Sequence, residues 1–237
     1  MLIGIDGTGP LLASKYSEEM RNSFVSQIVR SSREKHKYYF SGPSLLGAED
    51  LSIEFKVVSA VLKCLAAGDS ILFLTGYSRG GLIAIRVARN IQSSKPGKNL
   101  RIKCLMLFDA VDRDAFSGSS IIPSNVDVAL HAIRSPDVGS RKLFGNCGLR
   151  FEGNVNFQRK TFQATHAAMG GMPWSGDFPT STSTQIISTP EMYRIQTTTP
   201  ALILTTTSPN INKQQDISGA AAVKGWAWNS MSKYGMI

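Results

Sequence analysis

The residues best suited to chemistry are a serine and the glycines on either side of it. Gly76, Ser78 and Gly80 form a Gly-x-Ser-x-Gly pattern, with an apolar run over 71–74 before it and a helix-like segment over 82–89 after it. A buried strand, a sharp turn and a helix with serine at the apex form a nucleophile elbow. The glycines leave room in the crowded turn, and the hydroxyl is held out for reaction. The alternative interpretation is a glycine-rich turn without chemistry.

A serine hydroxyl needs a base to accept its proton, and histidine is the usual base near neutral pH. The sequence offers three histidines. His36 lies in a charged segment ahead of the elbow, and His131 lies in an apolar segment, where a hydrogen-bonded structural role is expected. His166 follows the last strand candidate and precedes two glycines, at a strand end. We predict His166 as the base, with a surface-loop histidine as the alternative.

A third group must orient the base. Asp109 ends the strand that follows the elbow helix, so it should lie beside the serine turn. Asp137 would follow the next strand, where many hydrolases of the α/β-hydrolase fold carry their acid. The order serine, acid, histidine is that of this fold, and both aspartates satisfy it. Position favours Asp109 and leaves Asp137, or another acid between Ser78 and His166, as the alternative.

Ester chemistry also needs N–H donors for an oxyanion. The N–H of Arg79, at the start of the elbow helix, is one candidate. The second should come from the loop after the first strand, where Gly7 or Thr8 could approach closely because Gly7 and Gly9 lack side chains. The alternative for this loop is an ordinary turn.

The elements that must position these residues alternate along the chain. Apolar patterning predicts strands at 2–5, 37–40, 70–75 and 101–108, and helices at 16–33, 48–67 and from the elbow to about residue 91. Such alternation predicts an α/β fold with a mostly parallel sheet and helices on both faces. The active site is then expected beyond the carboxyl ends of the strands.

The second half of the sequence is less regular. Residues 126–133 fit a strand or a short helix, and 149–164 carry one or two strands. Residues 175–215 are rich in Ser, Thr and Pro and predict a long excursion, either a lid over the site or a disordered loop, with a strand candidate at 201–206. Residues 217–234 predict a closing amphipathic helix. We expect a single domain over 1–237.

Composition narrows the function classes. The 237 residues carry a net charge of +9 and 42% hydrophobic residues, and no apolar run is long enough to span a membrane. The three cysteines have no metal-like spacing, so no disulfide framework, metal or cofactor is expected. No signal peptide is visible, so the protein is expected to be cytoplasmic as synthesised, and export by a contact-dependent secretion system would need no such signal.

Six short motifs follow one another along the chain: I-D-G-T-G (5–9), G-Y-S-R-G-G (76–81), F-D-A-V (108–111), H-A-I (131–133), H-A-A-M-G-G (166–171) and G-W-A-W-N (225–229). In this order they resemble the motifs of one family of α/β-hydrolases. That family contains the GxSxG-type phospholipase effectors of bacterial type VI secretion and their uncharacterised relatives. Pro10 and Ala168 replace an asparagine and an acid that the family usually carries. The resemblance implies a triad of Ser78, Asp109 and His166.

The residues and the resemblance together predict a serine hydrolase of carboxylic esters, with phospholipid as the leading substrate. A hydrolase of small esters or thioesters is one alternative, and a catalytically silent binding protein on the same fold is another. Expected partners are the ester or phospholipid substrate, an anionic membrane surface that suits the basic charge, and an inhibitor protein. No nucleic-acid-binding module is present in the sequence, so nucleic acid is not expected as a partner.

Overall fold

Six parallel strands form the central sheet of the computed structural model, which describes all residues except 11, 45–48, 113–120, 141–144 and 174–209. The strand order is β2-β1-β3-β4-β6-β8, and every neighbouring pair is parallel. The strands are β1 (Leu2–Ile5), β2 (Lys37–Phe40), β3 (Ile71–Tyr77), β4 (Arg101–Phe108), β6 (Val128–Arg134) and β8 (Asn156–Phe162). The predicted parallel sheet is therefore confirmed.

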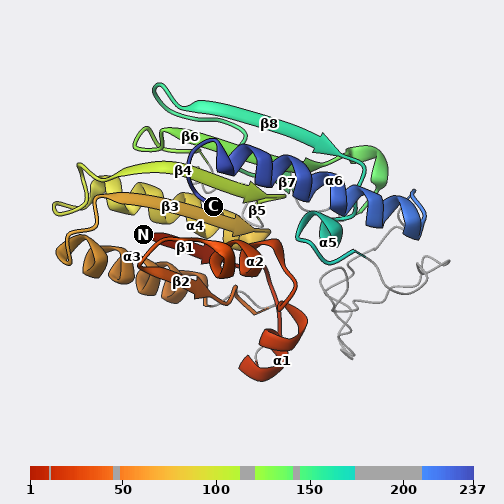
Figure 1. Ribbon diagram of the computed structural model, residues 1–237, viewed down its shortest axis with the longest axis horizontal. Coiled ribbons are helices and arrows are strands. Elements are labelled where there is room, and N and C mark those ends of the chain that lie inside the picture. The colour runs from red at the N-terminus through yellow and green to blue at the C-terminus, as the bar shows by residue number, and fades with distance from the viewer. Residues whose placement is uncertain (11, 45–48, 113–120, 141–144, 174–209) are drawn as a thin grey trace, which may run out of the picture.

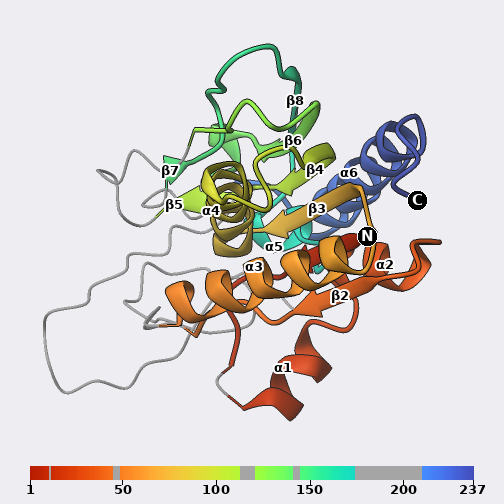
Figure 2. The same ribbon diagram turned by 90° about the vertical axis from the view of Figure 1, so that its left-hand side faces the viewer.

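Helices cover both faces of this sheet, as predicted. They are α1 (Ala13–Glu19), α2 (Phe24–Ser31), α3 (Asp50–Ala66), α4 (Arg79–Ser93), α5 (His166–Met169) and α6 (Lys213–Ser232). Helices α2 and α6 lie in front of the sheet in Figure 1, and α4 lies behind it. Figure 2 shows α4 and α6 on opposite sides of the strands. A short antiparallel pair, β5 (Val111–Asp112) with β7 (Gly145–Asn146), and a 3-10 turn at Pro136–Val138 complete the described elements.

The alternation of side chains along the strands explains why both faces are covered. In β3, Leu72 and Leu74 pack in the core beneath α3 and α4, whereas Phe73 and Tyr77 pack beneath α2 and α6. Successive strand residues point to opposite faces, so a strand that is apolar at almost every position needs a helical layer on each side.

The structure differs from the sequence prediction in the first helical region. The predicted helix over 16–33 is two helices, because α1 ends at Glu19 and α2 begins at Phe24. Ser23 caps α2, with its Oγ accepting from the N–H of Ser26 at 3.0 Å. The N–H of Phe24 donates to the carbonyl of Gly170 at 2.8 Å, which ties the break to a distant loop. Hydrophobic periodicity carries no information about such a contact.

The remaining predictions have mixed outcomes. The segment at 126–133 is the strand β6, and one named strand, β8, occupies 149–164. Most of the excursion at 175–215, with its strand candidate at 201–206, lies outside the described residues; its last residues begin α6, which Asn212 caps. No helix in the described part of the chain is long and apolar enough to cross a membrane.

Candidate active site

The turn between β3 and α4 has the backbone of a nucleophile elbow. Ser78 has φ 54° and ψ −126°, in a region that a residue with a side chain rarely adopts. A Cβ on Gly76 would lie 2.6 Å from the carbonyl oxygen of Gly80, and a Cβ on Gly80 would lie 2.2 Å from that of Asp6. Both glycines are therefore required by close backbone contacts, as the sequence predicted.

Ser78, His166 and Asp109 lie in one hydrogen-bonded chain at the carboxyl ends of the strands. The Oγ of Ser78 is 2.9 Å from Nε2 of His166, and Nδ1 of His166 is 2.6 Å from Oδ2 of Asp109. In Figure 1 the arrowheads of β3 and β4 point toward α5, which begins at His166. If Nδ1–H donates to the carboxylate, Nε2 is left to accept the serine proton.

The other candidates lie apart from this chain. Asp137 sits in the 3-10 turn, where its carboxylate accepts from the hydroxyl of Ser135 at 3.3 Å. His131 is fully buried, its Nδ1 contacting the carbonyl of Gly148 and its Nε2 accepting from the N–H of Ala110. His131 therefore has the structural role that its apolar segment indicates.

Five contacts that sequence reasoning missed fix the position of His166, directly or through Thr165. The ring of Tyr77 lies 5.1 Å from the imidazole between ring centroids, and its hydroxyl donates to the carbonyl of His166 at 3.0 Å. The N–H of His166 donates to Oγ of Ser140 at 3.0 Å. Thr165, the N-cap of α5, is held by Asp216 of α6 through its N–H at 2.7 Å and its hydroxyl at 3.1 Å. Tyr77 is adjacent to Ser78, which is a signal that sequence inspection could have used.

Asp109 has two further partners that the sequence did not reveal. The guanidinium of Arg134 pairs with Oδ2, and the amide of Asn146 donates to Oδ1 at 2.7 Å. Burial alone would raise the pKa of Asp109, but the charge of Arg134 and the hydrogen bonds from His166 and Asn146 hold it below its usual range. The carboxylate therefore stays ionised, as an orienting acid must.

The three predicted oxyanion donors differ in whether their N–H groups already have a partner. The N–H of Gly7 donates to Oδ1 of its neighbour Asp6 at 2.9 Å, so this donor is already engaged. None of the described hydrogen bonds uses the N–H of Thr8 or of Arg79. Of the three predicted donors, Thr8 and Arg79 remain available, whereas the N–H of Gly7 already donates to the adjacent carboxylate.

The loop that carries Thr8 begins at Asp6, whose buried carboxylate holds it in place. Asp6 is fully buried and accepts from the hydroxyls of Ser23 and Tyr39, the latter at 2.9 Å. Burial raises its pKa to about 6, and the hydrogen bonds only partly oppose this shift. A Cβ on Gly7 would lie 2.7 Å from the ring of Tyr77, so the loop packs directly against the elbow.

The side chain of Arg79 has a structural role beside its backbone role. Its guanidinium is buried and donates to the carbonyl of Ser44 at 2.9 Å and to the carboxylate of Asp50 at 2.7 Å. These contacts fasten the start of α3 to the elbow. The first turn of α4 is therefore tied to the start of α3.

Comparisons with known proteins leave the family of this chain open. No protein-family profile matches the sequence, and no curated protein matches it. The Tle1 effector bound to the VgrG spike from the type 6 secretion system is one similar solved structure, with 12% identity over 72% of this chain and a TM-score of 0.45. An uncharacterized protein from Pseudomonas aeruginosa shows 15% identity over 73% of this chain and a TM-score of 0.47. The chain covers 50% and 41% of those two chains, and such likenesses identify no activity.

Proposed function

We propose that this protein is a serine hydrolase that cleaves carboxylic esters through a triad of Ser78, His166 and Asp109. The observation that carries the proposal is the pair of contacts that His166 makes, at 2.9 Å to the serine oxygen and 2.6 Å to the carboxylate. A silent binding protein has less support, because it would not need a serine in a strained elbow within reach of a buried imidazole.

The first half of the reaction forms an acyl-enzyme. Oγ of Ser78 attacks the ester carbonyl carbon while its proton passes to Nε2 of His166. The carbonyl oxygen becomes an oxyanion, to which the N–H groups of Thr8 and Arg79 donate. The tetrahedral intermediate collapses, the ester C–O bond breaks, and the leaving alcohol takes the proton from Nε2.

The second half returns the enzyme to its starting state. Water gives a proton to Nε2 of His166 as its oxygen attacks the acyl carbon. A second oxyanion forms at the same two donors and collapses, which releases the carboxylic acid and returns the proton to Oγ of Ser78. Asp109 stays ionised throughout and stabilises the imidazolium in both halves.

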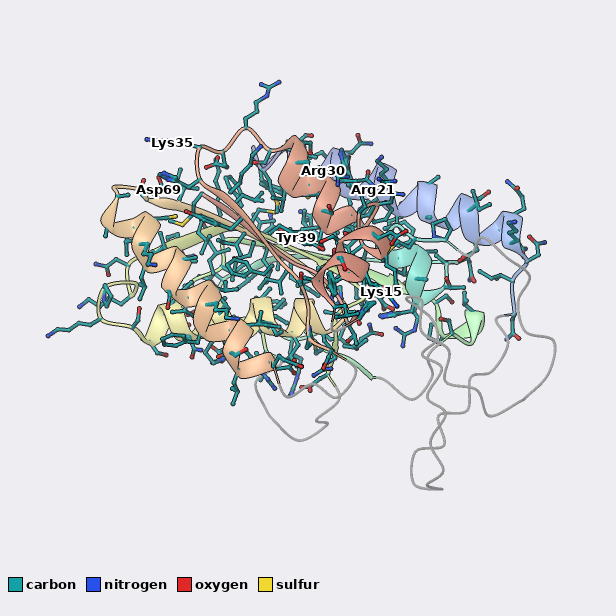
Figure 3. The ribbon with its side chains drawn as sticks, turned by 90° about the horizontal axis from the view of Figure 1, so that it is seen from below. Lys15, Arg21, Arg30, Lys35, Tyr39 and Asp69 are labelled. Carbon is teal, nitrogen blue, oxygen red and sulfur yellow. The ribbon has the colours of Figure 1, made fainter. Side chains whose placement is uncertain are left out.

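We propose a phospholipid as the substrate, on grounds of charge and of the motif resemblance. The net charge of +9 favours accumulation at an anionic bilayer, where lipid esters are presented. Figure 3 shows Lys15, Arg21, Arg30 and Lys35 along the side formed by α1, α2 and the turn before β2, and all four are exposed. The same resemblance supports an inhibitor protein as a partner and export by a contact-dependent secretion system as a destination.

The deciding experiment compares two substrates for the wild-type protein and Ser78→Ala. We expect the wild type to release free fatty acid from vesicles that mix neutral and anionic phospholipids, and Ser78→Ala to release none. A chromogenic short-chain ester and a matching thioester serve as soluble substrates. Brisk cleavage of either soluble substrate without fatty acid release would leave a small-ester or thioester hydrolase. No turnover of any of them would contradict the triad proposal itself.

A further inference from the structure

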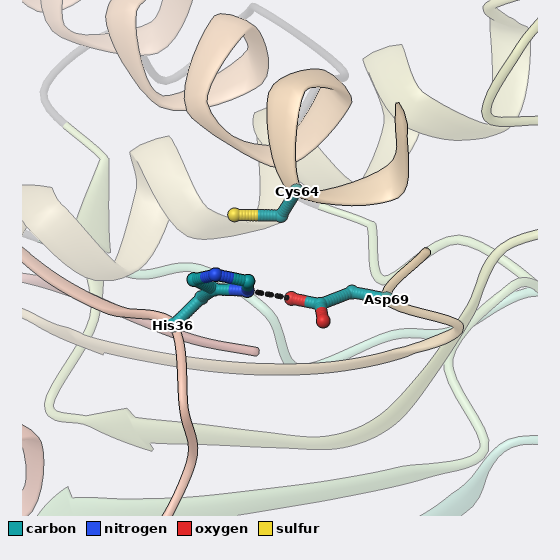
Figure 4. Close-up of side chains that lie close together, drawn as sticks. All are labelled: His36, Cys64 and Asp69. Carbon is teal, nitrogen blue, oxygen red and sulfur yellow. Dashed lines mark hydrogen bonds and ion pairs between the residues drawn. The ribbon is translucent and has the colours of Figure 1, made fainter. Parts of the chain in front are cut away.

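Three side chains with different ligand chemistry meet at the amino end of the sheet, far from the triad. His36 lies just before β2, Cys64 lies in the last turns of α3, and Asp69 lies in the turn into β3. One ligand atom from each lies within 4.8 Å of the other two. Figure 4 shows the sulfur of Cys64 above the imidazole, with Asp69 at the ring edge. In Figure 3, Asp69 lies at the opposite end of the molecule from α5.

The backbone around this cluster is fixed. The N–H of Asp69 donates to the carbonyl of Cys64 at 3.0 Å, so the two side chains leave one short turn. The carbonyl of His36 accepts from the N–H of Leu2 at 2.8 Å, which attaches the histidine to β1. Since β1 pairs with both β2 and β3, the three ligands are held by one hydrogen-bonded framework.

The distances are close to those of a tetrahedral zinc site. Nδ1 of His36 is 2.8 Å from Oδ2 of Asp69. Zinc bonds of about 2.0–2.3 Å place neighbouring ligand atoms roughly 3.3–3.7 Å apart. The nitrogen and oxygen would therefore separate slightly and the sulfur would approach, movements of about 1 Å that side-chain rotation can supply.

The environment of Cys64 also differs from that of the other cysteines. All three thiols are buried. Cys104 is surrounded by apolar side chains, and burial raises its pKa to about 12. Cys64 instead faces an imidazole and a carboxylate, with the hydroxyl of Tyr38 at 3.9 Å from its sulfur. Thiolate, neutral imidazole and carboxylate are the three side-chain ligands that zinc accepts.

The neighbouring charges are compatible with a cation here. The amino group of Met1 lies 3.8 Å from Oδ2 of Asp69, but it pairs more closely with Glu34, at 2.6 Å. Asp69 and Cys64 would bring two negative charges to a divalent ion when the thiol ionises, and His36 would bind as the neutral imidazole. The imidazole and the carboxylate are partly exposed, at 27% and 20% of their side chains, so an ion could enter from solvent.

We propose that His36, Cys64 and Asp69 form a zinc site with a water molecule as the fourth ligand. The ion would join the start of β2 to the end of α3 and the start of β3, and it would act on stability and not on ester cleavage. The sequence did not suggest this site, because the ligands are 28 and 5 residues apart and match no zinc-ligand spacing.

The test uses the full chain after dialysis against a chelator. Isothermal titration calorimetry with Zn²⁺ should show one ion bound per chain. The midpoint temperature of thermal unfolding should rise when the metal is bound. Titration with Co²⁺ should give the near-ultraviolet absorption of a thiolate–cobalt bond, which only a cysteine ligand produces. Cys64→Ser and His36→Gln should each weaken zinc binding by at least about 100-fold.

Matched controls test whether Cys64, and not another cysteine, binds the metal. Cys104→Ser and Cys147→Ser should keep both the cobalt absorption and the zinc affinity. Cys64→Ser should retain cleavage of a soluble ester, so failure of the metal site and failure of the hydrolase proposal are separate results. Absence of zinc binding to the wild-type chain, or equal binding by Cys64→Ser and the wild type, would overturn the proposal.

Discussion

Asp109 shows how one carboxylate can bind two neighbours, the imidazole of His166 and the guanidinium of Arg134. Its Oδ2 contacts both the imidazole of His166 and the guanidinium of Arg134, and its Oδ1 accepts from Asn146. The backbone of Asp109 has φ 42°, an unusual conformation for an aspartate, which the surrounding contacts maintain. The negative charge of Asp109 acts on the guanidinium of Arg134 as well as on the imidazole of His166. Arg134 therefore affects the electrostatics of the site.

Replacing the nucleophile is the first test at the residue scale. Ser78→Ala should lower ester turnover by roughly 10⁴-fold to 10⁶-fold, because binding and the oxyanion donors supply only a small residual rate. A fluorophosphonate probe should label Ser78 in the wild type and no serine in the variant. Turnover above about a tenth of the wild-type value in a folded variant would rule out Ser78 as nucleophile.

The choice between the two aspartates is the second test at this scale. Asp109→Asn should reduce turnover by about 10⁴-fold, because the amide favours the wrong tautomer of His166. Asp137→Asn is the matched control, since its carboxylate contacts Ser135 and turnover should stay near the wild-type value. Steady-state kinetics on a soluble ester measures both. The reverse pattern would transfer the orienting role to Asp137.

At the scale of elements, the base depends on a helix of only four residues. Helix α5 (His166–Met169) is too short to be stable alone, and its position comes from outside contacts. Asp216 of α6 accepts two hydrogen bonds from Thr165, and Tyr77 of β3 packs on the imidazole. The position of the base is therefore set by an element about 50 residues later in the chain, beyond the segment 174–209.

Asp216→Ala tests this dependence. The substitution leaves the N–H and hydroxyl of Thr165 without their buried acceptor, which should lower the free energy of unfolding by about 1–3 kcal/mol. Turnover should fall more than the folded fraction does, because His166 begins the loosened helix. Ser218→Ala, at an exposed position of α6, is the control and should change neither quantity. A turnover that simply follows the folded fraction would show that α6 does not position the base.

What the sequence can predict differs between elements for physical reasons. The bounds of β1, β2 and β4 follow from runs of apolar residues with a polar stop, and they match the structure. The break between α1 and α2 depends on a contact from Phe24 to Gly170, which periodicity cannot detect. Arg134 looks like a strand end in sequence, and only the pairing of β4 with β6 brings it to Asp109. Ser78 could be predicted from the sequence because the strand, the turn and the helix that define its role are adjacent in the chain.

At the scale of the molecule, two buried groups titrate in opposite directions. Burial raises the pKa of Asp6 from 3.8 to about 6 and lowers that of His131 from 6.5 to about 4. Protonated Asp6 favours the fold below pH 4, and this stability is lost as pH rises through 6. Neutral His131 favours the fold above pH 6.5, and this stability is lost as pH falls through 4. Each shift corresponds to about 3 kcal/mol, so the two effects largely cancel between pH 4 and 6.5.

Asp6→Asn should expose this compensation. Without the carboxylate, the free energy of unfolding should rise by about 3 kcal/mol from pH 4 to 6.5, because the effect of His131 is no longer opposed by that of Asp6. The wild type should stay nearly level over the same range. Urea unfolding at fixed ionic strength measures both, and Glu18→Gln, at an exposed site, should keep the wild-type profile. A wild-type profile that rises as much as that of Asp6→Asn would mean that Asp6 is ionised throughout this range in the folded protein, and a level profile for Asp6→Asn would contradict the shift of His131.

The basic charge gives the last prediction, which concerns how the whole molecule meets its substrate. Each Lys or Arg near an anionic surface contributes about 1 kcal/mol, and salt screens this attraction over roughly 8–10 Å. Turnover on anionic vesicles should therefore fall as salt rises, while turnover of a neutral soluble ester should not. The double variant Lys15→Gln and Lys35→Gln should lose about tenfold or more on vesicles at low salt.

The matched control is Lys95→Gln with Lys98→Gln, which removes the same charge from the exposed loop between α4 and β4. If α1 and the turn before β2 face the bilayer, the control should keep most of the vesicle activity, because its lysines lie on a different loop of the protein. Equal losses in both double variants would mean that net charge alone governs binding. If the wild-type turnover on vesicles does not depend on salt, the electrostatic support for a phospholipid substrate is removed. A soluble ester is then the favoured substrate.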